Sequence, residues 1–250
     1  MIPNKIAIIT GSSRGIGAET ARLFAENGYA VCINHVANDA AAEKTKNEIL
    51  GKGGQCIAVK ADVSVASEVT RLFETVDAEL GPVSVLVNNA GILKDQCRMI
   101  DISEARFEQV LRTNVMSCFI CCKEAVKRMS TQNGGTGGAI VNVSSGASKS
   151  GSPNEYIDYA ASKGAIDTLT RGLALEVADE GIRVNAVRPG LIHTEMHASG
   201  GEPNRVDRLQ SKIPMQRGGQ PEEVAEAIFW LGSEKASFVT GSFIDPSGGL

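Results

Sequence analysis

A tyrosine and a lysine, Tyr159 and Lys163, stand four residues apart in a stretch rich in helix-forming residues. Residues at this spacing share one face of a helix, so the phenol and the ammonium group are expected to be neighbours. A free tyrosine has a pKa of about 10, and a nearby positive charge lowers it towards neutral pH. Such a pair can exchange a proton with an oxygen atom, which suits the interconversion of a carbonyl group and an alcohol. The spacing alone is weak evidence, because many helices contain it by chance.

Two serines, Ser144 and Ser145, precede this tyrosine and follow an apolar run, 138–143, that is predicted to be a strand. Successive strand residues face opposite ways, so only one of the two hydroxyls is expected to reach a substrate oxygen. A second tyrosine, Tyr156, has Ala160 four residues later and no lysine. We therefore expect Tyr156 to line a pocket or to pack in the interior.

A glycine-rich segment lies near the N-terminus, after the apolar run 5–10 and before a helical pattern over 18–27. The apolar run is nearly continuous, as in a strand that is buried on both faces. A strand, a glycine-rich turn and a helix start form an arrangement that binds phosphate groups. Gly11 permits the tight turn, Gly15 lets the backbone approach a pyrophosphate, and Gly17 lets the helix pack close to the strand.

Six motifs occur in order along the chain: Thr10-Gly11-x3-Gly15-Ile16-Gly17, Asn88-Asn89-Ala90-Gly91, Asn114, Ser145, Tyr159-x3-Lys163 and Pro189-Gly190. With these motifs the chain resembles the short-chain dehydrogenase/reductase family over essentially its whole length. Sugar 1-dehydrogenases and 3-oxoacyl-thioester reductases are the most similar branches. The family pattern Ser-Ser-x-Ala selects the second serine. The stretch from that serine to the tyrosine is one residue longer than usual, and we place the extra residue within 152–157.

The resemblance implies a catalytic set of four polar residues: Asn114, Ser145, Tyr159 and Lys163. In this family Tyr159 would exchange the proton, Ser145 would hold the substrate oxygen, and Lys163 would also bind the ribose of the nicotinamide half. Asn114 would hold a water that links Lys163 to solvent. The resemblance also implies a set of dinucleotide-binding residues: Gly11, Ser13, Arg14, Gly15, Ile16, Gly17, Asn34, Asp62, Val63, Asn89, Ala90, Gly91, Tyr159, Lys163, Pro189, Gly190, Ile192 and Thr194.

The end of the second predicted strand favours NADP(H) over NAD(H) as the cofactor. An acid at this position accepts hydrogen bonds from the 2′-hydroxyl of NAD and repels a 2′-phosphate. Here Asn34 and His35 occupy it, and neither is negatively charged at neutral pH. Arg14 is a permanent cation that can pair with a phosphate. Asp39 follows closely and can supply the missing acid, so NAD(H) stays open.

The composition excludes several classes of protein. The net charge of −4 favours neither nucleic acid nor an anionic membrane as partner, and the longest apolar stretches are too short to span a bilayer. The six cysteines are scattered without metal-ligand spacing, which indicates free thiols in a reducing compartment and no metal. His193 and His197 are expected to face solvent or substrate. Met1 to Asn4 leave no room for a signal peptide, so we expect a cytoplasmic protein.

Strand and helix patterns alternate along the chain, which predicts an α/β fold. We expect one domain, residues 1–250, with a doubly wound Rossmann-type parallel sheet of about seven strands and helices on both faces. The segment 190–215 is polar and rich in Gly, Pro and Ser, and by resemblance it is a substrate lid. The expected strands are 5–10, 30–34, 55–60, 83–88, 138–143, 183–187 and 242–245, and the expected helices are 18–27, 40–52, 65–80, 103–131 (one short and one long), 156–180 and 221–231.

The substrate stays open between sugars and acyl thioesters. We expect four residues at the pocket: Cys97, Tyr156, Met196 and His197. They include no arginine or lysine to clamp a carboxylate or phosphate, which favours a neutral carbonyl compound. A dinucleotide-binding regulator with a dormant site is the alternative of another class, but all four catalytic residues are present. An epimerase or dehydratase would need a longer chain.

A homotetramer is expected. The long helical segments 107–128 and 156–180 carry more apolar residues than one sheet face needs, among them Met116, Phe119 and Leu175. By resemblance these helices pair across a two-fold axis, and the segment 242–250 makes a second contact.

Overall fold

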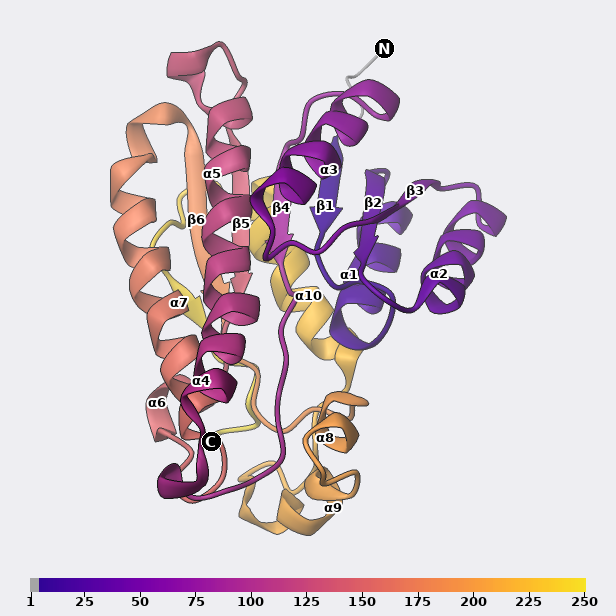
Figure 1. Cartoon of the computed structure of the whole chain (residues 1–250). Coiled ribbons are helices and arrows are strands. Elements are labelled where there is room, and N and C mark those ends of the chain that lie inside the picture. Colours follow the sequence, from indigo (N-terminus) through magenta and orange to yellow (C-terminus); the bar gives the residue numbers. More distant parts are fainter. Residues whose placement is uncertain (1–4) are drawn as a thin grey trace.

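The computed structural model describes residues 5–250. They form one seven-stranded sheet, all of whose pairings are parallel, with helices on both faces (Figure 1). The predicted fold class is therefore confirmed. Residues 1–4, on which the expectation of a missing signal peptide rests, lie outside the described residues.

The sheet has the order β3-β2-β1-β4-β5-β6-β7, so the strand order reverses between β1 and β4. Ligands of such sheets bind where the order reverses, beyond the carboxyl ends of the strands. The seven strands lie within two residues of the predicted bounds: β1 (Ile6–Ile9), β2 (Ala30–His35), β3 (Gln55–Lys60), β4 (Val85–Asn88), β5 (Gly138–Val143), β6 (Ile182–Val187) and β7 (Phe243–Ile244).

Ten α-helices occur within residues 5–250: α1 (Gly15–Glu26), α2 (Asp39–Gly51), α3 (Ala66–Glu79), α4 (Glu104–Leu111), α5 (Ser117–Met129), α6 (Ala147–Ser150), α7 (Ile157–Glu176), α8 (Met196–Ser199), α9 (Arg205–Leu209) and α10 (Pro221–Gly232). The predicted short and long helices of 103–131 are α4 and α5, joined by a π-helical turn, Arg112–Met116. The short helices α6, α8 and α9 lack a long apolar pattern and were not predicted individually. In the described part of the chain no helix is long and apolar enough to cross a membrane.

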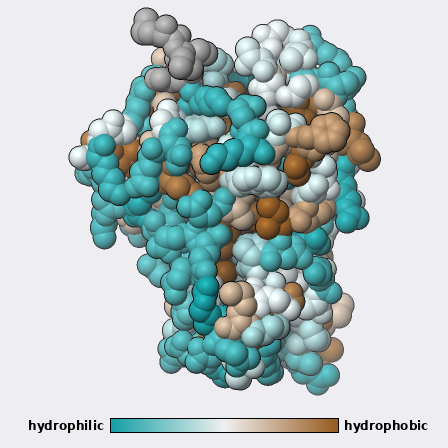
Figure 2. Space-filling model, turned by 180° about the vertical axis from the view of Figure 1, so that it is seen from behind, coloured by the Kyte–Doolittle hydropathy of each residue, from teal (hydrophilic) through white to brown (hydrophobic). Residues whose placement is uncertain are grey.

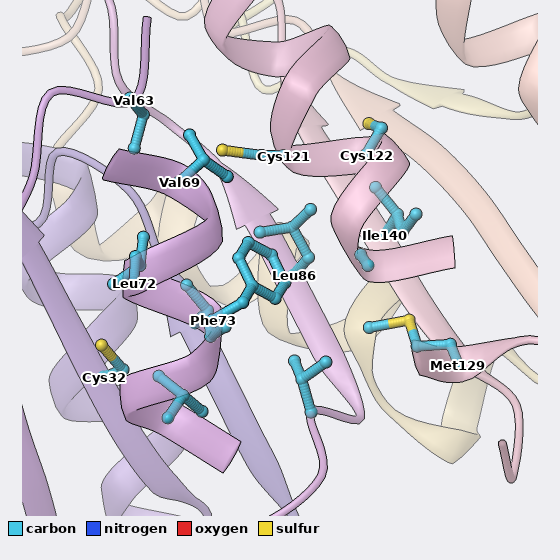
Figure 3. Close-up of a cluster of buried hydrophobic side chains, with 14 of the residues drawn as sticks. Cys32, Val63, Val69, Leu72, Phe73, Leu86, Cys121, Cys122, Met129 and Ile140 are labelled. Carbon is cyan, nitrogen blue, oxygen red and sulfur yellow. The ribbon is translucent and has the colours of Figure 1, made fainter. Parts of the chain in front are cut away.

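Each face of the sheet has its own apolar core. On one face, α3, α5 and α7 cover the strands, and the fully buried Phe73 and Leu86 meet beneath α3 and α5 (Figure 3). On the other face, α1, α2 and α10 pack around Phe24, whose ring contacts Tyr29 and Phe229 edge to face at 4.9 and 5.1 Å. The two cores fix the strands, and thereby the loops that leave their carboxyl ends.

Candidate active site

A cavity of about 570 Å³ opens at the carboxyl ends of the strands. Its wall runs from Ile16 and Asn89, beside the glycine-rich turn, past Tyr159 and Lys163 to the segment 190–215. Four of the predicted functional positions, from three separate regions of the sequence, therefore meet at one cavity.

The glycine-rich turn has the geometry that the sequence predicts. Gly11 and Gly15 have φ of +61° and +57°, a left-handed conformation that favours glycine. A Cβ on Gly17 would lie 2.5 Å from Asn89 Nδ2, which itself donates to the carbonyls of Thr10 and Gly11 at 2.9 Å. The first turn of α1 contains no acid, and no described side chain caps it, so its N–H groups remain available to an anion. These features fit the pyrophosphate of a dinucleotide.

Two of the predicted cofactor contacts have side chains that face the interior. Asn34 is buried, accepts the Gly11 N–H at 3.2 Å, and donates to the carbonyls of Val59 and Ala61 at 3.3 and 2.9 Å. Val63 is buried in the core beneath α3. Any contact of these two residues with the cofactor would therefore come from their backbone, and it stays a prediction. Asn34 instead ties the glycine-rich turn to β3, a role that its position alone did not reveal.

Paired charges surround the carboxyl end of β2, where the sequence predicts the adenosine ribose. His35 Nε2 lies 3.1 Å from Asp39 Oδ1, and Lys60 Nζ lies 3.0 Å from the same oxygen. Because Lys60 hydrogen-bonds Asp39, the pKa of that carboxyl is lowered and it stays ionised beside a cation. Arg14 Nη1 pairs with Glu195 of the segment 190–215 at 2.6 Å, and both side chains are more than half exposed. A solvent-exposed ion pair thus joins Arg14 to the segment 190–215.

The two adjacent serines have different partners. Ser144 is buried and its hydroxyl donates to the Lys163 carbonyl at 3.2 Å. Ser145 Oγ accepts the Ala147 N–H at 3.1 Å, and the same side chain lies near enough to the hydroxyl of Tyr159 to lower its pKa. Ser145 is therefore the serine that meets the tyrosine, and Ser144 anchors the backbone of α7.

The electrostatics of the tyrosine and the lysine differ from the expectation. Burial raises the pKa of Tyr159 to about 12, although the hydrogen bond from Ser145 opposes this rise. Burial lowers the pKa of Lys163 to about 8, and its Nζ donates to the Val143 carbonyl at 2.7 Å. The ammonium lies 5.5 Å from the centroid of the tyrosine ring. The expected fall of the tyrosine pKa is wrong here, because desolvation by burial is the largest effect on this group.

Asn114 lies buried in the π-helical turn and joins two segments at the cavity. Its Oδ1 accepts the Ile92 N–H at 2.8 Å, and its Nδ2 donates to the Ile92 carbonyl and to Ser162 Oγ at 3.1 and 3.0 Å. A Cβ on Gly91 would lie 3.3 Å from Asn114 Oδ1 and 3.7 Å from Lys163 Nζ. Asn114 and Lys163 therefore both approach Gly91, and the relay through a water stays a prediction.

The loop before α7, where the extra residue is predicted to lie, has an unusual backbone. Ser152 and Asn154 have φ of 44° and 62°, which are unusual for residues other than glycine. Tyr156 follows and does both things expected of it. It is buried, it lines the cavity, and its hydroxyl donates to the Gly200 carbonyl at 3.3 Å. Arg205 lies over its ring at 5.0 Å.

Four basic side chains line the cavity, so the expectation of a wall without arginine or lysine is wrong: Lys149, Arg188, Arg205 and Lys212. Three of them have acidic partners, as Arg188 has in Asp245 at 2.8 Å. Lys212 is exposed and has no acidic partner within residues 5–250. One of these four could have been found from the sequence, because Arg188 directly precedes the motif Pro189-Gly190, which was expected at the cavity.

Of the other three residues predicted at the pocket, two line the cavity and one does not. Met196 and His197 line the cavity, and the pKa of His197 is lowered by burial, so the ring is neutral at neutral pH. Cys97 is not on the wall, because its Sγ faces Arg106 Nη1 at 3.1 Å. All six cysteines are free thiols, and five of them are buried. In the described ranges no three His, Cys, Asp or Glu side chains gather as a metal site.

The chain matches known proteins over nearly its whole length. A family model described as enoyl-(acyl carrier protein) reductase matches residues 11–250. The oxidoreductase YgfF of Escherichia coli K12 is 61% identical over 98% of this chain and 99% of its own length. A 3-oxoacyl-[acyl-carrier-protein] reductase FabG of Staphylococcus epidermidis is 36% identical over 99% of both chains. Glucose 1-dehydrogenase 2 of Bacillus subtilis is 36% identical over all of this chain and 95% of its own.

Proposed function

The chain belongs to the short-chain dehydrogenase/reductase family, and we propose that it transfers a hydride between NADP(H) and a carbonyl or alcohol substrate. As a member it is an NAD(P)-dependent oxidoreductase. One observation carries the proposal: Ser145 and Tyr159 share the wall of one cavity, with Lys163 5.5 Å from the tyrosine ring, and that cavity begins beside the glycine-rich turn.

The proposed roles follow from the protonation states. With a pKa of about 12, Tyr159 carries its proton at neutral pH and can give it to a carbonyl oxygen that Ser145 holds. Lys163, with a pKa of about 8, is mostly charged and favours the phenolate that remains. Asn114 holds the loop after β4 beside Lys163. The bound nicotinamide supplies or accepts the hydride.

Preference for NADP(H) rests on the charges at the adenosine end. Neither Asn34 nor His35 is an acid, Asp39 is paired with Lys60, and Arg14 is available to a 2′-phosphate by exchanging its exposed partner Glu195. The same charges disfavour the alternative, an NAD(H)-dependent sugar dehydrogenase. In such an enzyme Asp39 would have to leave Lys60 and face the ribose. The remaining cofactor contacts are proposed for the backbone of Ser13 to Gly17, Asp62, Asn89 to Gly91, and Pro189 to Thr194.

The sugar and acyl-thioester alternatives are tested together. Purified protein is supplied with glucose, a 3-oxoacyl thioester and a small diketone, each with NADP(H) and with NAD(H), and the reduced nicotinamide is followed by absorbance. Turnover of one of these with a higher kcat/KM for NADP(H) supports the proposal. Tight dinucleotide binding without turnover of any of them supports the dormant regulator.

The proposal extends to the assembly. We propose one domain over residues 1–250, with 190–215 as its lid, that forms a cytoplasmic homotetramer. Support comes from free thiols, as in a reducing compartment, and from exposed apolar side chains on α5 and α7: Met116 at the α5 N-cap, Phe119 and Leu175. On the opposite side, hydrophobic residues gather in patches on a mostly hydrophilic surface (Figure 2), and Phe238 is fully exposed. Light scattering tests it: a monomer at micromolar concentration would refute the tetramer.

A further inference from the structure

The proposed catalytic tyrosine stands in a weak part of its helix. Tyr159 is the third residue of α7, and the N-cap residue Tyr156 makes no side-chain capping bond to the described chain. The first N–H groups of a helix have no partner within the helix, so first turns fray unless side chains hold them. A reacting hydroxyl needs a position fixed to within about 0.5 Å. Some other group must therefore secure this turn.

Asp158 supplies the missing contact. Its side chain is only 1% exposed, and its Oδ1 accepts the backbone N–H of Tyr159 at 2.9 Å. The carboxylate also lies in the first turn, where the helix dipole favours negative charge. Asp158 thus satisfies a backbone N–H of the first turn, as a capping residue would, although it lies within the helix.

Arg106 of α4 fixes that carboxylate from the other side. Its Nε lies 2.7 Å from Asp158 Oδ2, and its Nη2 lies 3.3 Å from Asp158 Oδ1. The same guanidinium donates through Nη1 to the Asp95 carbonyl at 2.8 Å and to Cys97 Sγ at 3.1 Å. The start of α4 and the first turn of α7 lie side by side (Figure 1). One buried fork therefore ties α4 and the loop after β4 to the backbone of Tyr159.

Stability alone does not explain a buried ion pair. Removing one partner of such a pair is strongly destabilising, but replacing both by apolar side chains is often neutral or stabilising. We propose that Asp158 and Arg106 are positioning residues that hold Tyr159 in register with Ser145. This inference rests on the proposed role of Tyr159 as acid and base.

The decisive variant removes both charges, as Asp158→Leu with Arg106→Met. We expect its melting temperature to stay close to that of the wild type and NADP⁺ to bind within about twofold, because neither residue lines the cavity. Hydrogen exchange of the Tyr159 amide is expected to rise at least tenfold. With the best substrate of the screen, kcat is expected to fall about 10²-fold, as for a misplaced reacting group.

A matched control removes a second ion pair, between α1 and α2, as Arg22→Met with Glu48→Leu. Neither exchange at Tyr159 nor kcat should change in it. If kcat and amide protection in the Asp158→Leu, Arg106→Met variant match the wild type, the positioning role is overturned. If that variant does not fold, Asp158→Asn replaces it. This substitution keeps an oxygen acceptor but loses the charge, so amide exchange should rise only slightly and less than in Asp158→Ala. Equal exchange in the two variants overturns the proposal.

The two proposals fail in different ways. Wild-type turnover in Tyr159→Phe would reject the proposed function and leave the exchange result intact. Unchanged exchange in the variants would reject the positioning role and leave the proposed function intact.

Discussion

The two ends of the cavity are built from different parts of the chain. At the nucleotide end, the fit depends on the backbone: Gly11 and Gly15 have left-handed φ, and Gly17 leaves no room for a side chain. At the proposed reaction end, it depends on two polar side chains, the partly buried Tyr159 and the buried Lys163, whose pKa values desolvation shifts in opposite directions. Backbone N–H groups can bind a ligand only where no side chain fills the space beside them. The pKa values of a tyrosine and a lysine depend instead on how far each side chain is shielded from water.

Loss of the phenol should have the largest effect and spare the nucleotide end. Tyr159→Phe is expected to reduce kcat about 10³-fold, because general acid–base catalysis contributes a factor of this order. NADP⁺ binding, measured by fluorescence titration, should stay within about threefold. Tyr29→Phe is the control, since Tyr29 packs on Phe24 away from the cavity. Wild-type turnover in Tyr159→Phe would show that the phenol is not needed for the reaction, and would contradict the role proposed for this end of the cavity.

Lys163 should make stability depend on pH. Its folded pKa of about 8 lies below its ordinary value of 10.5, so between these values the unfolded chain holds a proton that the folded chain has released. Stability of the wild type should therefore rise with pH across this window, and below it the buried charge opposes folding by up to about 3 kcal/mol. Urea unfolding of Lys163→Met should show a gain at pH 7 that shrinks through the window. Lost bonding to the Val143 carbonyl will reduce this gain.

The exposed Lys52, paired with Glu26, provides the control for this measurement. Lys52→Met should change stability little and equally at all of these pH values. If Lys163→Met changes the free energy of unfolding by the same amount at every pH from 7 to 10.5, the proposed electrostatic origin is contradicted.

Filling the space at Gly17 should damage the nucleotide end. In Gly17→Ala the new Cβ would lie 2.5 Å from Asn89 Nδ2 and 2.7 Å from the Gly11 carbonyl oxygen, so the turn must move. We expect a loss of about 2 kcal/mol in the free energy of unfolding and at least tenfold weaker NADP⁺ binding. Gly51→Ala is the control, because within the described residues nothing lies within 4 Å of that Cβ. If the two variants have the same free energy of unfolding and the same affinity for NADP⁺, the turn does not depend on the absence of a side chain at Gly17.

Arg14 should have the smallest effect and a selective one. Arg14→Ala is expected to weaken NADP⁺ binding about tenfold and to leave NAD⁺ binding unchanged, since a charged hydrogen bond to the 2′-phosphate is lost. Glu195→Gln should leave NADP⁺ binding equal or slightly tighter, because it frees Arg14 from its exposed partner. Isothermal titration with both dinucleotides measures this. Equal weakening of both by Arg14→Ala would assign the residue to the pyrophosphate instead.

The nucleotide end was the more predictable of the two. The spacing of Gly11, Gly15 and Gly17 after an apolar run indicates the turn directly, because glycine is the residue that such a backbone demands. Strand positions were also predictable, since buried parallel strands are continuous apolar runs. Helix ends differed by up to four residues, as at Glu176, where α7 ends before the predicted Glu180.

The reaction end was predictable in its residues and not in its environment. The spacing of Tyr159 and Lys163 gave their common helix face, but their pKa values depend on how deeply the fold buries them. The basic wall of the cavity comes from four separate segments that only the tertiary structure brings together. The pairing of Asp158 with Arg106 has no sequence pattern, because the two residues are fifty-two positions apart.

The π-helical turn Arg112–Met116 holds one residue more than an α-helical turn would, and α4 and α5 continue on either side of it. Deleting one residue within this turn would close it to α-helical geometry and leave the two flanking helices near their present register. Deleting one residue within α5 would instead rotate the rest of that helix by about 100° and turn Cys121 and Cys122 out of the core. What the shorter turn would lose is the placement of Asn114, whose amide bridges Ile92 and Ser162. The extra residue of this turn thus serves the position of one side chain and not the course of the helix.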